Sequence, residues 1–204
     1  MPQPPAPLCV ARRLRFGWPG RPLFDTLSFA IKPGLTLIHG GESCGKTTLL
    51  RLLGGEIVPT GGSLLREAGA AFHADLGDPA LNATTARNWL VQQQQRWSAW
   101  DAAAAAAAID ALALVPHLDK TFAMLSTGSR RKRGLVAAAA SGAALTLLDQ
   151  PYAALDAPSC RWLDRRLHHA AAERSRAWVL ADYVLPAGLA GAALAAEIDL
   201  GEGS

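Results

Sequence analysis

Apolar and polar residues tend to alternate over residues 9–31, near the start of the chain. Such alternation is typical of strands with one buried face. Trp18, Pro19 and Gly20 interrupt the pattern with turn-forming residues. We therefore expect two strands joined by a tight turn, which together form a small antiparallel layer.

A short apolar run at residues 35–39 is followed by a glycine-rich segment, and a helix-like pattern then begins at residues 47–53. This order predicts a strand, a glycine loop and a helix. Turn residues fill 54–62, after which residues 63–72 supply a further strand. The polar stretch at 74–82 is expected to form a functional loop.

The middle of the chain predicts helices. Thr84 or Thr85 can cap a helix that runs through the glutamines 92–95, and Asp101 can cap another through the alanines 102–108. These helices predict a helical subdomain at about residues 82–140, inserted within a single domain that spans residues 9–204. The proline-rich residues 1–8 are expected to form a flexible tail.

The second half returns to core-like strands at residues 144–148 and 177–181, separated by a helical segment at 159–172. Strands that alternate with helices at this spacing indicate a parallel sheet covered on both faces. The predicted fold class is therefore α/β, with the antiparallel layer and the helical subdomain as additions to the parallel sheet.

The strongest chemical signal is the segment 40–47, which matches the pattern GxxxxGK[ST] between the predicted strand and helix. Backbone N–H groups and the positive end of a helix can wrap phosphate oxygens only where side chains are small. The motif predicts that Lys46 reaches the β- and γ-phosphates of ATP and that the Thr47 hydroxyl coordinates Mg²⁺. The residues expected to bind the nucleotide here are Gly40, Gly41, Glu42, Ser43, Cys44, Gly45, Lys46, Thr47 and Thr48.

The strand at 144–148 ends in Asp149, which is predicted to hold Mg²⁺ directly or through water. Read alone, an apolar run that ends in aspartate is equally compatible with an ordinary strand end. The three cysteines show no metal-binding spacing and are interpreted as reduced thiols. Because Cys44 lies inside the glycine loop, an alkylating reagent is expected to reach it when nucleotide is absent.

Residues 125–129 read Leu-Ser-Thr-Gly-Ser, and Asp149 and then the segment Ala154-Leu155-Asp156 follow. In this order the motifs resemble those of the ATP-binding cassette (ABC) ATPases. The resemblance covers nearly the whole chain and implies a P-loop NTPase fold with a RecA-like parallel sheet. The length is similar to that of the small ATP-binding subunits of bacterial haem exporters in cytochrome c maturation.

The resemblance implies that ATP lies between the P-loop of one cassette and the signature motif of a second, either identical or unlike. Ser126 and Gly128 would then contact the γ-phosphate held by the partner chain, and Asp156 belongs to the same set of nucleotide-site residues. Trp18 would stack on adenine, although a buried core tryptophan is the alternative. The basic run at 130–133 is better explained by solvent or phosphate contact than by nucleic acid.

Several positions depart from the family pattern. The glutamate expected after Asp149 is Gln150, which can orient a water molecule but cannot accept its proton. Asp182 aligns with the switch histidine and His73 with the Q-loop glutamine, while Ser129 replaces the signature glutamine. His73 has an alternative interpretation as an exposed loop histidine. ATP hydrolysis by this chain is therefore expected to be weak, and whether the chain works as an enzyme is left open.

Composition changes this picture little. The formal net charge is +3 with half the residues apolar, which gives no indication of nucleic-acid binding. No uncharged run is long enough to cross a bilayer. The family resemblance instead implies a cytoplasmic subunit on the inner face of a bacterial membrane, coupled to a separate transmembrane permease. The alternative is a regulatory module that uses ATP-dependent dimerisation without transport.

Overall fold

The computed structural model describes residues 5–66, 69–74 and 78–201. The chain divides into two compact units. The sheet unit comprises residues 1–73, 144–150 and 166–204, and the helical unit comprises residues 74–143 and 151–165. Residues 1–4 of the predicted tail lie outside the described residues, whereas the Leu8 N–H already donates to the Ile31 carbonyl at 2.7 Å.

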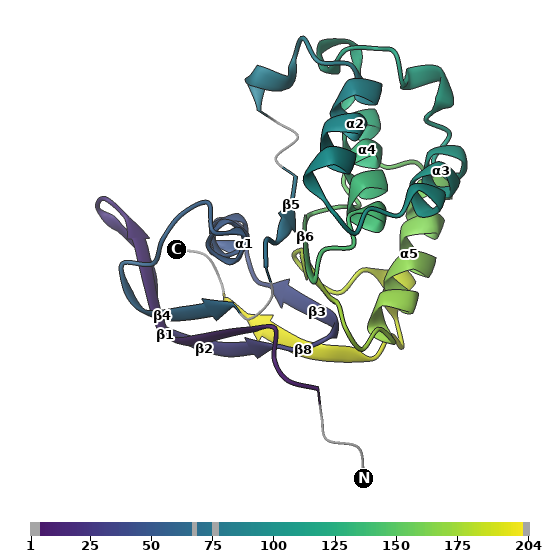
Figure 1. The fold of residues 1–204 in the computed structure, drawn as a ribbon. Helices are drawn as coiled ribbons and strands as arrows, with labels where there is room; N and C mark the ends of the chain where they lie inside the picture. The colour runs from purple at the N-terminus through teal and green to yellow at the C-terminus, as the bar shows by residue number, and fades with distance from the viewer. Residues whose placement is uncertain (1–4, 67–68, 75–77, 202–204) are drawn as a thin grey trace. The chain divides into compact units, whose positions relative to one another are not determined.

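A three-stranded antiparallel sheet forms one layer of the sheet unit (Figure 1). Strands β1 (Cys9–Trp18) and β2 (Arg21–Ile31) form the predicted hairpin, and β4 (Gly61–Arg66) pairs with the other side of β1. The strand order is β2-β1-β4. The prediction of a small antiparallel layer is confirmed.

The single strand predicted at residues 63–72 is wrong. The chain instead forms β4, which pairs with β1 in the antiparallel sheet, and the separate short strand β5 (Phe72–His73), which pairs with a different sheet. Residues 67–68 between them lie outside the described residues. The apolar pattern continues across both strands because each buries one side, so periodicity alone does not separate them.

The second sheet is parallel, with the order β5-β6-β7-β3-β8. Strands β3 (Gly34–His39), β6 (Leu145–Asp149) and β7 (Ala177–Ala181) were predicted and are almost wholly buried. The edge strand β8 (Leu194–Asp199) was not predicted. Helix α1 (Lys46–Gly54) follows β3 through the glycine loop.

The core of the sheet unit lies among the two sheets and α1. Leu49, Leu50 and Leu53 of α1 are fully buried and pack with Ile38 of β3 and Val179 of β7 in one apolar cluster. Burial of side chains of this size contributes about 1.5–3 kcal/mol each. This packing fixes the start of α1, and therefore the glycine loop, against the carboxyl edge of the parallel sheet.

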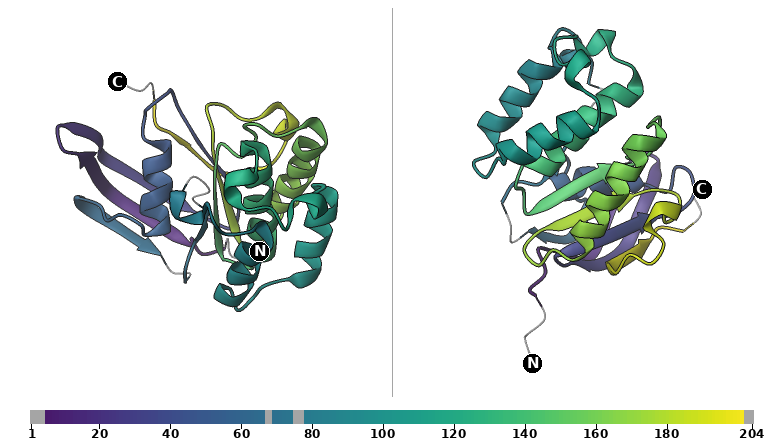
Figure 2. Two further views of the ribbon diagram at one scale, coloured as in Figure 1. Left: turned by 90° about the horizontal axis from the view of Figure 1, so that it is seen from above. Right: turned by 90° about the vertical axis from the view of Figure 1, so that its right-hand side faces the viewer.

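The helical unit contains α2 (Ala86–Arg96), α3 (Ala102–Ala111) and α4 (Thr127–Ala140), with α4 in contact with both others (Figure 2). As predicted, Thr85 and Asp101 cap α2 and α3, because their side-chain oxygens accept N–H groups in the first turns. Short 3₁₀ turns lie at Pro79–Leu81, Val115–His117 and Phe122–Met124. In the predicted loop at 74–82, residues 75–77 lie outside the described residues.

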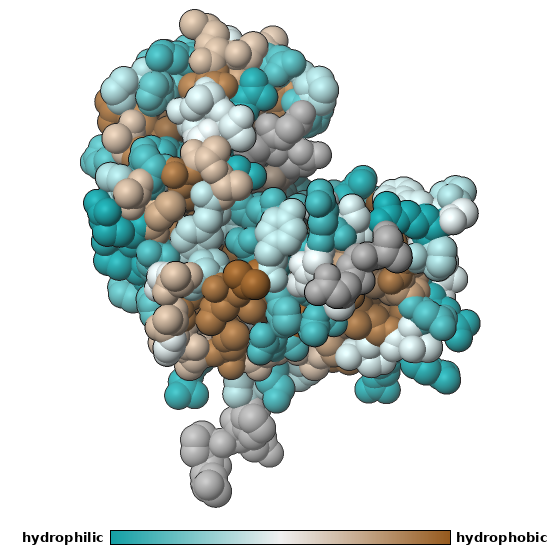
Figure 3. Space-filling view, turned by 180° about the vertical axis from the view of Figure 1, so that it is seen from behind, coloured by the Kyte–Doolittle hydropathy of each residue, from teal (hydrophilic) through white to brown (hydrophobic). Residues whose placement is uncertain are grey.

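Helix α5 (Ala157–Ala171) begins in the helical unit and ends in the sheet unit, where a 3₁₀ turn at Ala187–Leu189 follows β7. On the face shown in Figure 3, hydrophilic residues surround several patches of hydrophobic residues. Large apolar side chains that remain exposed include Val58, Leu65, Val91, Met124 and Val184. Within the described ranges, none of the helices is both long and apolar enough to cross a membrane.

Candidate functional site

The glycine loop joins the carboxyl end of β3 to the N-terminus of α1. Gly45 caps the helix in a left-handed conformation with φ of 102°, and a Cβ atom there would lie 2.8 Å from the Phe24 ring. Both the backbone conformation and the lack of space therefore require glycine at this position. Gly40, at φ of 147°, is equally crowded, since a Cβ atom would lie 2.9 Å from the Cys44 sulfur.

Lys46 is the central cation of the loop. Its ammonium donates to the carbonyl oxygens of Gly40 at 2.7 Å and Gly41 at 2.6 Å, and lies 3.6 Å from the Cys44 sulfur. Lys46 is only 6% exposed, so its charge is held close to the backbone. An anion that enters the loop would exchange these contacts for charge-assisted hydrogen bonds.

Thr47 and Asp149 bring two oxygen ligands together at the loop. The Thr47 hydroxyl donates to Asp149 Oδ2 at 2.6 Å, while Asp149 Oδ1 is buried and has no hydrogen-bond partner among the described residues. A buried carboxylate oxygen without a partner is costly unless a ligand satisfies it. This pair fits Mg²⁺, which prefers few protein oxygens with phosphate and water completing the shell. No cluster of three or more His, Cys, Asp or Glu side chains in the described part of the chain would hold a metal unaided.

Gln150 follows Asp149 and adopts a left-handed backbone with φ of 42°. Its N–H donates to the Ala181 carbonyl of β7 at 2.8 Å. A non-glycine residue in this region costs about 1 kcal/mol or more, and such strain clusters at functional sites. The hydrogen bond to Ala181 therefore holds Gln150 at the edge of the glycine loop.

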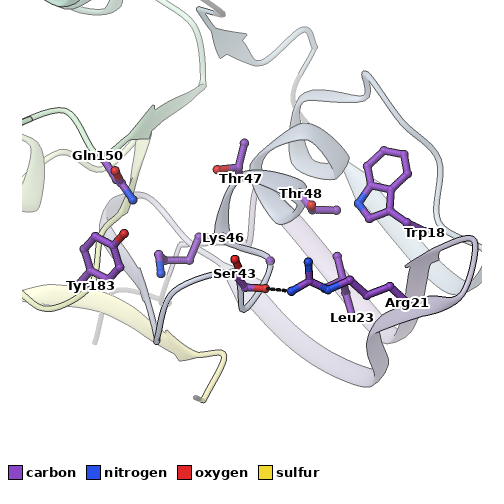
Figure 4. A pocket seen from close by; sticks show the side chains of 10 residues that line it. Trp18, Arg21, Leu23, Ser43, Lys46, Thr47, Thr48, Gln150 and Tyr183 are labelled. Atoms are coloured by element: carbon purple, nitrogen blue, oxygen red, sulfur yellow. Dashed lines mark hydrogen bonds between the residues drawn. The ribbon is translucent and has the colours of Figure 1, made fainter. Parts of the chain in front are cut away.

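A pocket of about 210 Å³ is lined by half of the predicted site residues of the sheet unit (Figure 4). Gln150 and Tyr183 lie on one side, Trp18 and Arg21 on the other, and Lys46 and Thr47 between them. Sequence reasoning missed Arg21, Leu23 and Tyr183. The residues that line the pocket are Trp18, Arg21, Leu23, Ser43, Gly45, Lys46, Thr47, Thr48, Gln150 and Tyr183.

Trp18 lies in the pocket with 43% of its surface exposed, so the alternative of a buried core tryptophan is wrong. Its ring stands edge-on to Phe16, with centroids 5.2 Å apart. Arg21, its partner across the hairpin, donates to the Ser43 carbonyl at 3.2 Å and so joins the hairpin tip to the glycine loop. Glu42 is exposed on that loop, whereas Cys44 is buried within it.

His73 does not lie among the pocket residues. It ends strand β5 at the edge of the parallel sheet, its side chain is 9% exposed, and its Nδ1 is hydrogen-bonded to a Glu56 carboxylate oxygen. The alternative interpretation of an exposed loop histidine is therefore wrong.

Asp182 is likewise absent from the lining of the pocket, which Tyr183 joins instead. The Asp182 carboxylate accepts the Tyr183 N–H at 2.8 Å, and the Asp182 N–H donates to the Ile38 carbonyl of β3 at 3.0 Å. The turn that presents Tyr183 is thus fixed to strand β3.

The segment after β8 packs on the glycine loop. The Gly41 N–H donates to the Gly201 carbonyl at 2.9 Å, and the Leu200 N–H donates to the His39 carbonyl at 2.9 Å. His39 also contacts the carboxylates of Glu197 at 3.0 Å and Asp199 at 3.7 Å. The unpredicted strand β8 therefore helps to support the loop.

The remaining predicted residues lie in the helical unit. Ser126 caps α4, its hydroxyl accepting the Ser129 N–H at 3.2 Å. Gly128 lies in the first turn, where a Cβ atom would collide with the Ala154 carbonyl oxygen. The helix N-terminus thus packs tightly on the segment after Gln150, and its free N–H groups favour an anion.

Asp156 is held by Lys132, whose ammonium donates to Asp156 Oδ2 at 2.6 Å. Hydrogen bonds from Lys132 and Ser159 lower the pKa of the Asp156 carboxyl below its usual range. The Asp156 carboxylate therefore makes its hydrogen bonds and its ion pair within the helical unit.

Arg133 corrects the expectation for the basic run. It is fully buried, and its guanidinium carbon lies 3.1 Å from the centroid of the Phe122 ring and 5.1 Å from that of Trp89. None of its three guanidinium nitrogens has a hydrogen-bond partner among the described residues. Burial, with a contribution from Arg130, lowers the pKa of Arg133 to about 9.

The glycine-lined loop follows the carboxyl end of β3, and Asp149 ends β6, which is separated from β3 by β7 in the same parallel sheet. Together they define a P-loop nucleotide-binding protein. Comparison with known proteins identifies the class further. The ABC transporter family profile matches residues 24–153, and this chain belongs to that family.

Curated relatives are similar over most of their length. The Cytochrome c biogenesis ATP-binding export protein CcmA of Pseudomonas syringae pv. syringae is 33% identical over 179 residues, which cover 80% of this chain and 83% of that protein. The protein of the same name from Zymomonas mobilis subsp. mobilis is 38% identical over 152 residues, covering 73% and 66%.

Solved structures agree on the fold. An ATP-binding protein of an ABC transporter from Pyrococcus furiosus superimposes with a TM-score of 0.72 at 17% identity, covering 94% of this chain and 96% of the other. The predicted α/β cassette fold, with its parallel sheet, antiparallel layer and helices, is confirmed.

Proposed function

We propose that this chain is the ATP-binding subunit of a bacterial ABC exporter of the cytochrome c biogenesis type. ATP with Mg²⁺ closes a dimer of cassettes, identical or unlike, and the closure moves a separate transmembrane permease on the inner face of the cell membrane. The names of the relatives support the export assignment. The observation that carries the nucleotide assignment is the convergence of Lys46, Thr47 and Asp149 on one loop.

Different residues of the sheet unit bind different parts of the nucleotide. Trp18 stacks on the base at one side of the pocket, and the loop amides with Lys46 bind the phosphates. Thr47 and Asp149 hold Mg²⁺, whose chemistry is to neutralise phosphate charge during hydrolysis. Ser126 and Gly128 of the second cassette cover the phosphates through the N-terminus of α4.

Hydrolysis is weakened in this chain. Gln150 stands where a carboxylate general base would receive the proton of the attacking water, and an amide can only orient that water. Tight binding with slow turnover would make ATP a long-lived clamp between the two cassettes. An unlike partner with an intact site would leave one of the two sites able to hydrolyse ATP.

Calorimetry of the purified protein with Mg²⁺ and ATP tests the binding step. The Lys46→Ala variant is expected to bind at least tenfold more weakly, because the loop then lacks its phosphate cation. Lys32→Ala is the matched control, since Lys32 is an exposed lysine of the same unit. Absence of ATP affinity in the unmodified protein would contradict the assignment.

Purification from the native membrane with ATP tests the coupling step. Co-purification of a multispanning subunit is expected, and it should be lost with Lys46→Ala if dimer closure is required. Recovery of an ATP-dependent dimer without any multispanning partner would instead favour a regulatory module without transport.

A further inference from the structure

Tyr183 touches the cation of the glycine loop. The Lys46 ammonium lies 4.4 Å from the centroid of the Tyr183 ring, and both residues line the same pocket as Gln150. Tyr183 is 46% exposed although it follows the fully buried strand β7. An aromatic ring on a turn, half exposed and stacked near the phosphate cation, is not needed to build the core.

The turn gives Tyr183 a fixed position. Its N–H donates to the Asp182 carboxylate, and the Asp182 N–H is anchored to Ile38 of β3. The Asp182 carboxylate is thus hydrogen-bonded to the backbone, and the Tyr183 side chain faces the pocket (Figure 4). A phenol hydroxyl can donate to a phosphate oxygen, whereas a carboxylate repels it.

The residues along the pocket indicate which way a bound nucleotide would run. Trp18 and Tyr183 lie on opposite sides of Lys46, with Gln150 on the side of Tyr183 (Figure 4). A nucleotide whose base lies on Trp18 and whose phosphates follow the loop amides would place its last phosphate toward Tyr183. ADP, which is one phosphate shorter, would not extend as far.

We propose that Tyr183 is the residue by which this site distinguishes ATP from ADP. In the absence of nucleotide its ring holds the Lys46 ammonium by a cation–π contact. When ATP binds, Lys46 turns to the phosphates and the Tyr183 hydroxyl donates a hydrogen bond to the terminal one. This proposal rests on the nucleotide site proposed above and adds a specific residue to it.

The sequence supplies a matched control. It contains two tyrosines, and the second, Tyr152, lies in the helical unit with its hydroxyl donating to Asp164 at 2.7 Å. Tyr152→Phe removes the same atom as Tyr183→Phe without changing the pocket of the sheet unit.

The first experiment compares the dissociation constants of ADP and of an ATP analogue with a β,γ-imido bridge, both with Mg²⁺, by calorimetry. Tyr183→Phe keeps the ring and is expected to weaken the ATP analogue about tenfold while leaving ADP within twofold, as for a lost hydrogen bond to a charged group. Tyr183→His restores a donor and should recover most of the preference. Tyr152→Phe should change neither constant.

The second experiment reports on the ring itself. Incorporation of 3-fluorotyrosine gives two ¹⁹F resonances, which Tyr152→Phe assigns. The Tyr183 resonance is expected to move on addition of ADP, as Lys46 leaves the ring, and to move to a different position with the ATP analogue. The Tyr152 resonance serves as the internal reference.

The outcomes separate the two proposals. If the unmodified protein binds neither nucleotide, the proposed function fails. If it binds both but Tyr183→Phe leaves their ratio unchanged, or the Tyr183 resonance has one position with both ligands, the role of Tyr183 is overturned and the nucleotide site stands.

Discussion

Thr47 and Asp149 lie 102 positions apart in the chain, yet the hydroxyl of one donates to the carboxylate of the other at 2.6 Å. The contact joins the first turn of α1 to the end of β6. It also fixes the position of the next residue, Gln150, beside the loop. The proposal of weak hydrolysis therefore rests on the chemistry that Gln150 offers at this position.

Gln150→Glu is expected to raise the steady-state rate of ATP hydrolysis about 10²- to 10⁴-fold, because a carboxylate can accept the proton of the attacking water. Phosphate release with Mg²⁺ and ATP measures the effect. Gln95→Glu, on the exposed part of α2, is the control and should leave the rate unchanged. Rapid hydrolysis by the unmodified protein would refute the weakened site.

Arg133→Met is expected to raise the free energy of unfolding at pH 7 by about 1–3 kcal/mol, because it removes a buried charge that has no hydrogen-bond partner in the described part of the chain. Chemical denaturation measures this change. Arg161→Met, at an exposed position of α5, should stay within about 0.5 kcal/mol. A destabilised Arg133→Met would show that the contacts with Phe122 and Trp89 outweigh the desolvation of the charge.

The same variant has a pH signature. The folded-state pKa of Arg133 is about 9, well below the ordinary value of an arginine side chain in the unfolded chain. Between these values the unfolded chain holds a proton that the folded chain has lost, so this residue makes stability rise with pH. The advantage of Arg133→Met over the unmodified protein should therefore be smaller at pH 10 than at pH 7.

Gly128→Ala is expected to destabilise the protein by about 1–3 kcal/mol, because the new methyl group meets the Ala154 carbonyl oxygen. Thermal unfolding measures the loss. Gly69→Ala is the control, since nothing lies within 4 Å of a Cβ atom there. Equal melting temperatures for the two variants would mean that the segment at Ala154 shifts at no cost.

Alkylation of Cys44 by N-ethylmaleimide is expected to abolish nucleotide binding, and bound ATP should slow the reaction about tenfold. The Cys160→Ser background removes the more exposed thiol. Cys44 is itself buried in this structure at 7% exposed, so its alkylation requires the glycine loop to open. Cys9 should react more slowly still, because it is 0% exposed and burial raises its pKa to about 11. Cys44→Ser in the same background should bind nucleotide and resist the reagent, whereas loss of binding in it would assign the effect to another residue.

The elements that the sequence could predict are those with local signals. The loop at 40–47 has a fixed pattern, and the caps at Thr85 and Asp101 act within one turn. Strand β8 was not predicted because Leu194–Asp199 lies half exposed at a sheet edge, and its alanine-rich start does not distinguish a strand from a helix. The split of residues 63–72 into β4 and β5 depends on partners far away in the chain.

Arg133 and Tyr183 also show how far the sequence could predict the candidate sites. Arg133 belongs to a basic run, but it shares one face of α4 with Val136, Ala137 and Ala140, all of them buried. That helical spacing was a usable signal. Tyr183 had no such signal in the sequence. Its place in the pocket depends on the turn after β7, which Asp182 holds through hydrogen bonds to the Tyr183 N–H and to Ile38 of β3.

The contact between Gly41 and Gly201 has a practical consequence for anyone who expresses this protein. A truncated form that ends before residue 201 would lack the carbonyl that accepts the Gly41 N–H. The glycine loop would then have one backbone amide without its partner. Shortened forms for crystallisation should therefore keep Gly201.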